Sequence, residues 1–189
     1  ENAQDLADKV NLNDEDRRYF CMVNGRFIFG DFIEAFAVEN NLLIEDLTLS
    51  TLAYSKENVE SLKNLIVGDY VQSLNIIVSD YFYSHNRDNV AYTYEQLDID
   101  DKFQLAIAGT HTKVTLIRSG DKRIVITGSA NLRSSRSVEE ITIQDNAELY
   151  DFHKSWHDDV LRQYATIKKS IRSDKLWSVI NEQQSDQSG

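Results

Sequence analysis

The most informative part of the chain, residues 111 to 131, reads HTKVTLIRSGDKRIVITGSAN. Two runs rich in β-branched residues, 113–117 and 123–127, flank a Ser-Gly-Asp centre, which predicts a β-hairpin. Side chains along a strand alternate between its two faces, so we expect His111 and Lys113 to project from the same face. The first arm of the hairpin therefore presents an imidazole and an ammonium group side by side.

The second arm of the hairpin ends in a small, polar turn, Gly128-Ser129-Ala130-Asn131. We expect this turn to bring a hydroxyl and a carboxamide to the imidazole and ammonium of the first arm. These four groups suit a phosphoryl group, because they supply one nucleophile or acid/base, one fixed positive charge and neutral donors for the equatorial oxygens. The alternative is that Ser129 and Asn131 only form the turn, since such residues are common in turns.

The pattern His111-x-Lys113, followed by Gly128-Ser129-x-Asn131, resembles the HKD signature of the phospholipase D superfamily. The resemblance implies an α/β fold with a mixed, mostly parallel β-sheet flanked by helices on both faces. It also implies an activity, the hydrolysis of phosphodiester bonds through a phosphohistidine intermediate.

The resemblance, strongest over residues 103–165, extends to a glutamate that family members often carry shortly after the GSxN element. Two adjacent candidates, Glu139 and Glu140, stand there, and the pattern alone does not say which one reaches the site. By position, Glu140 fits the family's glutamate slightly better. The residues that the resemblance implies for catalysis are His111, Lys113, Ser129, Asn131 and Glu140.

One position departs from the family pattern, which has an aspartate five residues after the lysine, where this chain has Arg118. Counted back from the glycine, Asp121 has the family's spacing, but the family's aspartate normally closes the first strand. That favours Arg118 as the replacement and Asp121 as a turn residue. Arg118 is then either an exposed hairpin charge or a residue that binds the substrate, and Arg133 and Ser134 are further candidates for substrate binding.

The chain as a whole is acidic, whereas the candidate site is basic. The net charge of −11 argues against a protein that coats nucleic acid without specificity. Between residues 111 and 138, however, there are six basic residues and one acid, Asp121, as an anionic substrate would require. The six are Lys113, Arg118, Lys122, Arg123, Arg133 and Arg136. The alternative is that these are solvated charges of the hairpin.

A chain of 189 residues with 41% hydrophobic residues is long enough for one α/β domain with its own core. We expect that domain over 19–181, after a polar arm (1–18) that forms a short helix or is loosely held, and before a disordered tail (182–189). No apolar run approaches the roughly 20 residues that a membrane helix needs, and the first residues lack the features of a signal peptide. With one cysteine, Cys21, expected to be buried, these features favour a cytoplasmic protein without a membrane partner.

Strands and helices alternate along the expected domain. Apolar runs predict strands at 19–23, 47–52, 74–78, 103–108 and 138–143. Helical spacing predicts helices over 31–40 with Asp31 as cap, between Ser55 and Gly68, within 80–101, and after a capping box formed by Asp145 and Glu148. The order strand, helix, strand is typical of a mostly parallel sheet.

The remaining histidines give weaker signals. His85, together with Arg87, could line the mouth of a site, although a loop histidine usually has no such role. His153 and His157 are one helical turn apart, which is metal-ligand spacing, but the sequence offers no third ligand. We expect neither a metal nor another cofactor.

Phosphodiester cleavage by a histidine nucleophile needs two imidazoles on opposite sides of the phosphorus. This chain has one His-x-Lys pair, so the second imidazole is expected from another copy in a C2 homodimer, as the resemblance implies for small single-motif nucleases. The expected function is a metal-independent nuclease, because size and the lack of a membrane-seeking surface favour nucleic acid over lipid. The alternative is a module of the same fold that binds nucleic acid or a protein partner without cleaving.

Overall fold

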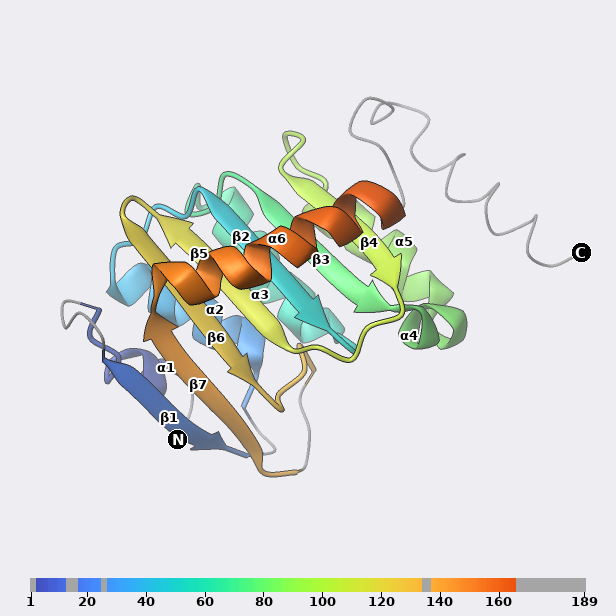
Figure 1. Cartoon of the computed structure of the whole chain (residues 1–189). Helices are drawn as coiled ribbons and strands as arrows, with labels where there is room; N and C mark the ends of the chain where they lie inside the picture. Colours follow the sequence, from blue (N-terminus) through green and yellow to red (C-terminus); the bar gives the residue numbers. More distant parts are fainter. Residues whose placement is uncertain (1–2, 13–16, 25–26, 134–136, 166–189) are drawn as a thin grey trace, which may run out of the picture.

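The computed structural model describes residues 3–12, 17–24, 27–133 and 137–165, which form one sheet with helices on both faces (Figure 1). The strands are β1 (Arg18–Val23), β2 (Asp46–Thr51), β3 (Leu74–Ser79), β4 (Phe103–Ala108), β5 (Val114–Ser119), β6 (Lys122–Gly128) and β7 (Glu139–Asp145). The helices are α1 (Ala3–Ala7), α2 (Phe29–Glu39), α3 (Lys56–Val67), α4 (Asp80–His85), α5 (Arg87–Leu97) and α6 (Ala147–Tyr164).

The sheet has the strand order β1-β7-β6-β5-β2-β3-β4. Strands β2, β3 and β4 are parallel to one another, because helices connect them, and the other four pairings are antiparallel. The expected α/β class is confirmed, but the expectation of a mostly parallel sheet is wrong. The connections between β5, β6 and β7 are too short for a crossover helix, so these strands pair as antiparallel neighbours.

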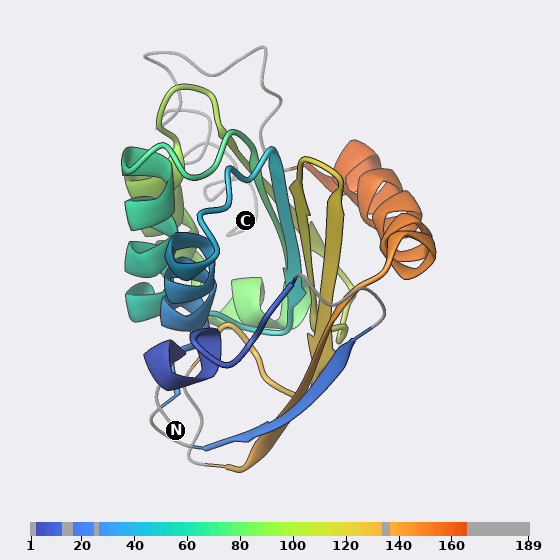
Figure 2. The ribbon, with the colours of Figure 1, turned by 90° about the vertical axis from the view of Figure 1, so that its left-hand side faces the viewer.

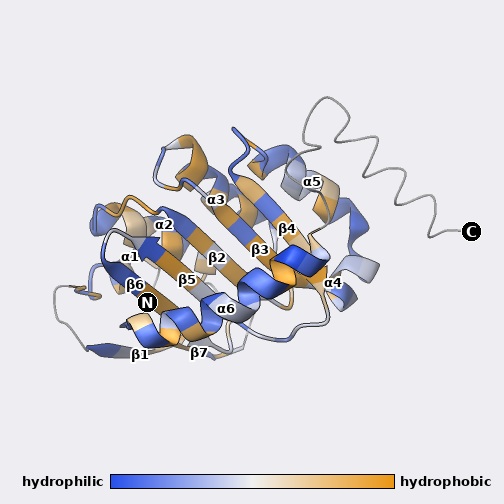
Figure 3. Ribbon diagram, turned by 45° about the horizontal axis from the view of Figure 1, so that its top comes forward, coloured by the Kyte–Doolittle hydropathy of each residue, from blue (hydrophilic) through white to orange (hydrophobic). Residues whose placement is uncertain are grey.

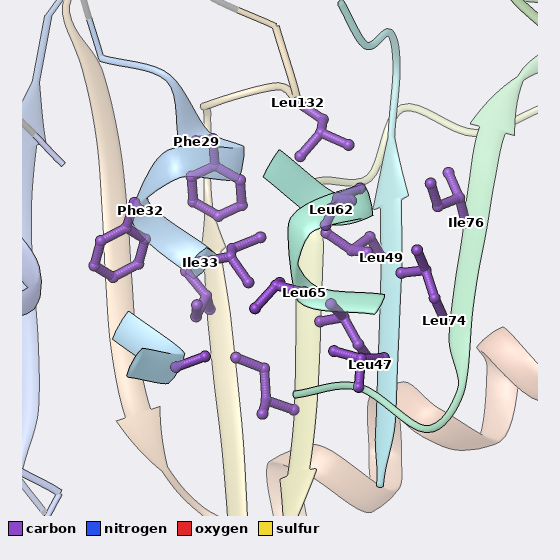
Figure 4. Close-up of a cluster of buried hydrophobic side chains, with 14 of the residues drawn as sticks. Phe29, Phe32, Ile33, Leu47, Leu49, Leu62, Leu65, Leu74, Ile76 and Leu132 are labelled. Carbon is purple, nitrogen blue, oxygen red and sulfur yellow. The ribbon is translucent and has the colours of Figure 1, made fainter. Parts of the chain in front are cut away.

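Helices cover the two faces of the sheet unequally (Figure 2). Helices α1, α2, α3 and α5 lie on one face, where the main core contains fully buried side chains such as Phe32, Ile33 and Leu62 (Figure 4). Helix α6 alone crosses the other face, above two smaller apolar clusters. Hydrophilic residues interrupt the apolar strands (Figure 3). The buried Asp46 lies on the α6 side, 3.4 Å from Lys154 Nζ, and accepts a hydrogen bond from the buried Asn75. The sheet therefore has one apolar face and one mixed face.

Helix α2 begins earlier than its capping pattern predicts. It starts at Phe29, so that Asp31 lies in its first turn and accepts a hydrogen bond from the Ser61 hydroxyl instead of capping the helix. The N–H of Gly30 donates to the side-chain oxygen of Asn58 on α3 at 2.7 Å. A Cβ at Gly30 would lie 2.9 Å from the Asn58 carbonyl oxygen, so this close approach of α2 and α3 requires a glycine.

Helix α6 has a different cap from the one expected. The side chain of Asn146 accepts a hydrogen bond from the N–H of Leu149 at 2.9 Å, and the helix starts at Ala147. Asp145, the expected cap, instead accepts from the N–H of Arg123 at 2.8 Å. Position alone favoured Asp145, but its side chain is used to close the pairing of β6 with β7.

The segment before β1 contributes to the core where the structure describes it. Leu6, Ala7, Val10 and Leu12 are buried, and α1 packs against α2, so this part is not a loosely held arm. Cys21 on the edge strand is half-buried, less than expected. The expected tail lies outside the described residues, as does the end of the expected domain from residue 166. Of the described helices, none is long and apolar enough to cross a bilayer.

Candidate active site

Most of the candidate residues belong to segments at one end of the strands, not to an edge strand; Figure 1 shows these strand ends. Strands β2, β3, β4, β6 and β1 end there, and β5 and β7 begin there, because Ser50 lies opposite Val114 and Val23 opposite Glu139. We call this the site edge, formed by residues 109–113, 128–133 and 137–139. The opposite edge, formed by residues 45–46, 118–123 and 145, is called the turn edge.

His111 and Lys113 lie just before β5, which starts at Val114. The hydroxyl of Thr112 is 2.9 Å from that of Ser50 on β2, which fixes this segment across the end of β2. Lys113 lies on the opposite side from Thr112, where it is half-buried, and its Nζ donates to the His111 carbonyl oxygen at 3.0 Å. The imidazole of His111 is exposed, as a residue that must reach an external substrate requires.

Ser129 is tied to the start of β7 by three hydrogen bonds. Its N–H donates to the Glu140 carbonyl oxygen at 2.9 Å, its hydroxyl accepts from the Glu140 N–H at 3.0 Å, and the same hydroxyl donates to the Glu139 carboxylate. Glu139 is opposite the buried Val23, whereas Glu140 is exposed and opposite the exposed Met22. The structure therefore brings the carboxylate of Glu139, and only the backbone of Glu140, to Ser129.

Asn131 is held by the end of β2. Its side-chain oxygen accepts from the N–H of Leu52 at 3.1 Å and from the hydroxyl of Thr51 at 3.4 Å. The next residue, Leu132, is buried, and its N–H donates to the same Thr51 hydroxyl at 3.0 Å. Because the carboxamide oxygen is used in this way, the amide nitrogen of Asn131 is the group that can donate to a ligand.

Two small pockets adjoin at this edge, since Ala130 lines both of them. Lys113 lies in the first, together with the hydroxyl-bearing Ser50 and Thr115. The second is lined by, among others, Asn131, Arg133 and Glu139. Two cations, one carboxylate and one carboxamide thus surround the 128–133 turn. This set can bind a phosphate through the cations and the amide while the carboxylate orients Ser129.

Arg118 lies at the turn edge, far from this set. It is five residues after Lys113 on an extended strand, which corresponds to roughly 17 Å. Its guanidinium is 3.3 Å from the carboxylate of Glu45. Strand β5 carries Arg118 away from His111, and an acid at the turn edge pairs with it, which supports the alternative that Arg118 is a charge of the hairpin.

The other basic residues of the hairpin are divided in the same way. At the turn edge, Lys122 forms an ion pair with Asp145 at 3.1 Å. Arg123 there donates to two backbone carbonyls of the hairpin turn. Of the expected basic cluster, the structure leaves Lys113 and Arg133 at the site edge, and Arg136 lies outside the described residues, as does Ser134, the other candidate for substrate binding. The cluster is therefore smaller than its sequence suggests.

The remaining histidines lie in different parts of the structure. His85 is exposed on α4, a helix rather than a loop, which follows β3 at the site edge. His157, a residue of α6, is fully buried and stacks on Trp156 with ring centroids 3.7 Å apart. Its Nδ1 is 2.7 Å from the His153 carbonyl oxygen. Over the described part of the chain, no three His, Cys, Asp or Glu side chains form a metal-binding group.

Comparisons with known proteins give structural matches only. No family model matches the chain, and no curated protein sequence matches it. Its structure is similar to that of NucT from Helicobacter pylori, with a TM-score of 0.56 and 14% identity over 79% of this chain and 99% of that one. It is also similar to Nuc from Salmonella typhimurium, described as a phospholipase D family member, with a TM-score of 0.56 and 12% identity over 78% of this chain and 97% of that one.

A third match is phosphatidylserine synthase from Haemophilus influenzae Rd KW20, with a TM-score of 0.56 and 12% identity over 89% of this chain and 44% of that one. The chain has the fold of the phospholipase D superfamily. At such low identities the similarity establishes the fold alone, and the chemistry has to be argued from the site itself.

Proposed function

We propose that the chain is a phospholipase D-like phosphodiesterase, a metal-independent nuclease that works through His111. One observation carries this proposal: an exposed imidazole, a half-buried ammonium and the Ser129–Asn131 turn all belong to the site edge of a sheet with this fold. NucT and Nuc, the second described as a phospholipase D family member, support it, since the chain matches nearly their whole length. The sequence pattern and the position of these segments in the sheet support the same proposal, with Glu139 rather than Glu140 at Ser129.

The reaction consists of two displacements. A ring nitrogen of His111 attacks phosphorus and forms a P–N bond, while the P–O bond to the leaving group breaks and a second imidazolium gives its proton to that oxygen. The second imidazole then takes a proton from water, whose oxygen attacks phosphorus and breaks the P–N bond. Lys113 and the amide nitrogen of Asn131 stabilise the charge on the equatorial oxygens. Glu139 positions Ser129 by accepting a hydrogen bond from its hydroxyl.

The second imidazole comes from another copy of the chain. None of His85, His153 and His157 is followed by a lysine at the second position, and His157 is fully buried. A two-fold axis at the site edge places two copies of His111 on opposite sides of one phosphate. The functional unit is therefore a homodimer that shares one active site.

The alternative, a module that binds without cleaving, was suggested by Arg118 in place of the family's aspartate. In the structure Arg118 pairs with Glu45 at the turn edge, roughly 17 Å along the strand from Lys113. A change at this distance leaves the arrangement of His111, Lys113, Ser129 and Asn131 intact. The location of Arg118 therefore favours the enzyme over the module.

Fluorescent single-stranded and double-stranded DNA, incubated in EDTA, tests the proposal. We expect cleavage by the wild-type protein, none by His111→Ala, and normal cleavage by His153→Ala, which removes an imidazole on α6 instead. Binding of DNA without cleavage by the wild-type protein would support the non-cleaving module. Sedimentation tests the shared site separately, because a protein that stays monomeric at micromolar concentration contradicts it.

A further inference from the structure

Helix α4 lies at the site edge but is not part of the set described above. Strand β3 ends there at Ser79, and α4 starts with Asp80. A Cβ built on Gly109 would lie 3.7 Å from the carboxylate of Asp80, and Gly109 is two residues before His111. Figure 1 shows α4 beside the segment that leads from β4 to β5. The first residues of α4 thus lie beside the segment that leads to the proposed nucleophile.

This helix has one anchored side and one open side. Phe82 is buried, and its ring contacts that of Tyr54, with ring centroids 4.7 Å apart. Tyr81, by contrast, is 64% exposed, and its ring lies against that of the exposed His85, with ring centroids 4.5 Å apart. The packing of the helix is carried by Phe82, so it does not explain the exposed pair.

The exposed pair is fixed in place. His85 Nδ1 lies 2.8 Å from the Tyr81 carbonyl oxygen and 2.9 Å from the Ser84 hydroxyl, so the imidazole is oriented by the helix itself. The ring of Tyr81 therefore packs against an imidazole of fixed orientation, so it loses less conformational freedom on binding a ligand than an unsupported ring would. A second mixed pair follows, in which the guanidinium of Arg87 is 5.8 Å from the centre of the Tyr83 ring.

Charge limits what the phosphates of a nucleic acid can contribute here. The chain carries a net charge of −11, and Asp80 is exposed beside Tyr81. Lys113 and Arg133 are the described cations at the site edge, with Arg87 at the start of α5. With so few phosphate contacts, a nucleic acid substrate needs affinity from its bases, and an exposed aromatic ring supplies it by stacking.

We propose that Tyr81, supported by His85, stacks on a nucleobase next to the phosphate at His111, so that the site takes single-stranded nucleic acid. The inference rests on the proposed function, because it places a phosphodiester at His111. In a duplex the faces of the bases are already stacked on each other, and a lipid headgroup has no aromatic face. Only an unpaired strand offers a ring to Tyr81.

Binding tests the inference independently of cleavage when every protein carries His111→Ala and the buffer contains EDTA. The two probes are a fluorescent oligothymidylate and an oligomer of equal length made of abasic sugar-phosphates, which has the same charge and no bases. We expect the oligothymidylate to bind about 5- to 100-fold more tightly than the abasic oligomer. Tyr81→Ala should abolish this preference, and Tyr81→Phe, which keeps the ring, should retain it.

Phe152→Ala is the matched control, because Phe152 is 67% exposed on α6, which covers the other face of the sheet. It should keep the full preference for bases. Stacking releases no counterions, so Tyr81→Ala should weaken oligothymidylate binding without changing the slope of affinity against salt. A Tyr81→Ala protein that keeps the preference for bases overturns the inference. Equal binding of both probes by the protein in which Tyr81 is unchanged also overturns it.

Hydrolysis of bis(p-nitrophenyl) phosphate by the protein with His111 intact separates the two proposals. If this small diester is cleaved and the base preference is missing, the phosphodiesterase stands and the stacking role of Tyr81 is wrong. If the preference depends on Tyr81 and no diester is cleaved, the stacking role stands and the enzyme is wrong.

Discussion

The two ends of the β5–β6 hairpin carry the same kinds of side chain and use them in opposite ways. At the turn edge each described cation has a partner: Arg118 pairs with Glu45, Lys122 with Asp145, and Arg123 donates to backbone carbonyls. At the site edge Lys113 donates to one backbone carbonyl, and His111 is exposed. Partnered charges hold a structure together, whereas charges without an acid beside them remain available to an anion. The comparison separates stabilising residues from functional ones within one hairpin.

The largest expected difference is in catalysis. Lys113→Met removes the positive charge next to the reacting phosphate and should lower kcat/KM by about 100- to 1,000-fold. Arg118→Met removes a charge from the same strand at the turn edge and should leave kcat/KM near the wild-type value. The measurement is single-stranded DNA cleavage in EDTA under initial-rate conditions. Equal losses in the two variants would contradict the division of the hairpin.

Stability should show the reverse pattern. Asp46 is buried at the turn edge, where it accepts from Thr48 and Asn75 at 3.0 Å and lies 3.4 Å from the Nζ of Lys154 on α6. Asp46→Ala leaves these donors without their acceptor, so the free energy of unfolding should fall by about 2–3 kcal/mol. Urea denaturation measures this difference.

The matched variant for stability is Glu139→Ala at the site edge. Glu139 is only partly buried, so its removal should cost less than about 1 kcal/mol of unfolding free energy. A Glu139→Ala protein that is destabilised as much as Asp46→Ala would show that the site edge also holds the sheet together.

A smaller effect distinguishes the two adjacent glutamates. Glu139→Gln weakens the acceptor that orients the Ser129 hydroxyl and should lower kcat about tenfold with little change in KM. Glu140→Gln alters an exposed side chain opposite Met22 and should leave kcat unchanged. A loss confined to Glu140→Gln would restore the assignment that residue spacing alone had favoured.

The sequence predicts local features of this fold better than long-range ones. The hairpin, all five of the other predicted strands, and the helix between Ser55 and Gly68 are confirmed, since periodicity and turn chemistry act over a few residues. The antiparallel pairing of β2 with β5 has no such signal, because the alternation of side chains does not name the partner strand.

The candidate site shows the same limit. Lys113 and Asn131 line adjoining pockets at the site edge, and His111 and Ser129 belong to the same two segments, which stand at the paired ends of β5 and β6. Alternation does not fix which face of a strand looks into the site, so it could not choose between Glu139 and Glu140. Nor could a local pattern show that Arg118 pairs with Glu45, which comes from a distant part of the chain. The partners of Asp46 come from β2, β3 and α6, and no local pattern connects them.

The smallest expected effect is on the pH dependence of stability. It concerns two histidines, the exposed His111 at the site edge and the buried His157 on α6. Burial lowers the pKa of His157 from 6.5 to about 4. Within the described chain its Nε2 is buried without a hydrogen-bond partner. The unfolded chain therefore binds more protons than the folded one between these two values. The contribution of His157 to stability is complete above about pH 6.5 and is lost as the pH falls towards 4.

His157→Phe keeps a flat ring against Trp156 and removes the titrating group. From about pH 7.5 to about pH 5.5, the free energy of unfolding of the wild-type protein should fall by about 1 kcal/mol more than that of His157→Phe. Because carboxylates titrate equally in both proteins, the difference between the two urea curves isolates the imidazole. His111→Phe leaves His157 in place, so its unfolding free energy should keep the loss that His157 causes. If the two variants show the same pH dependence of the free energy of unfolding, the protonation of His157 does not contribute to that dependence.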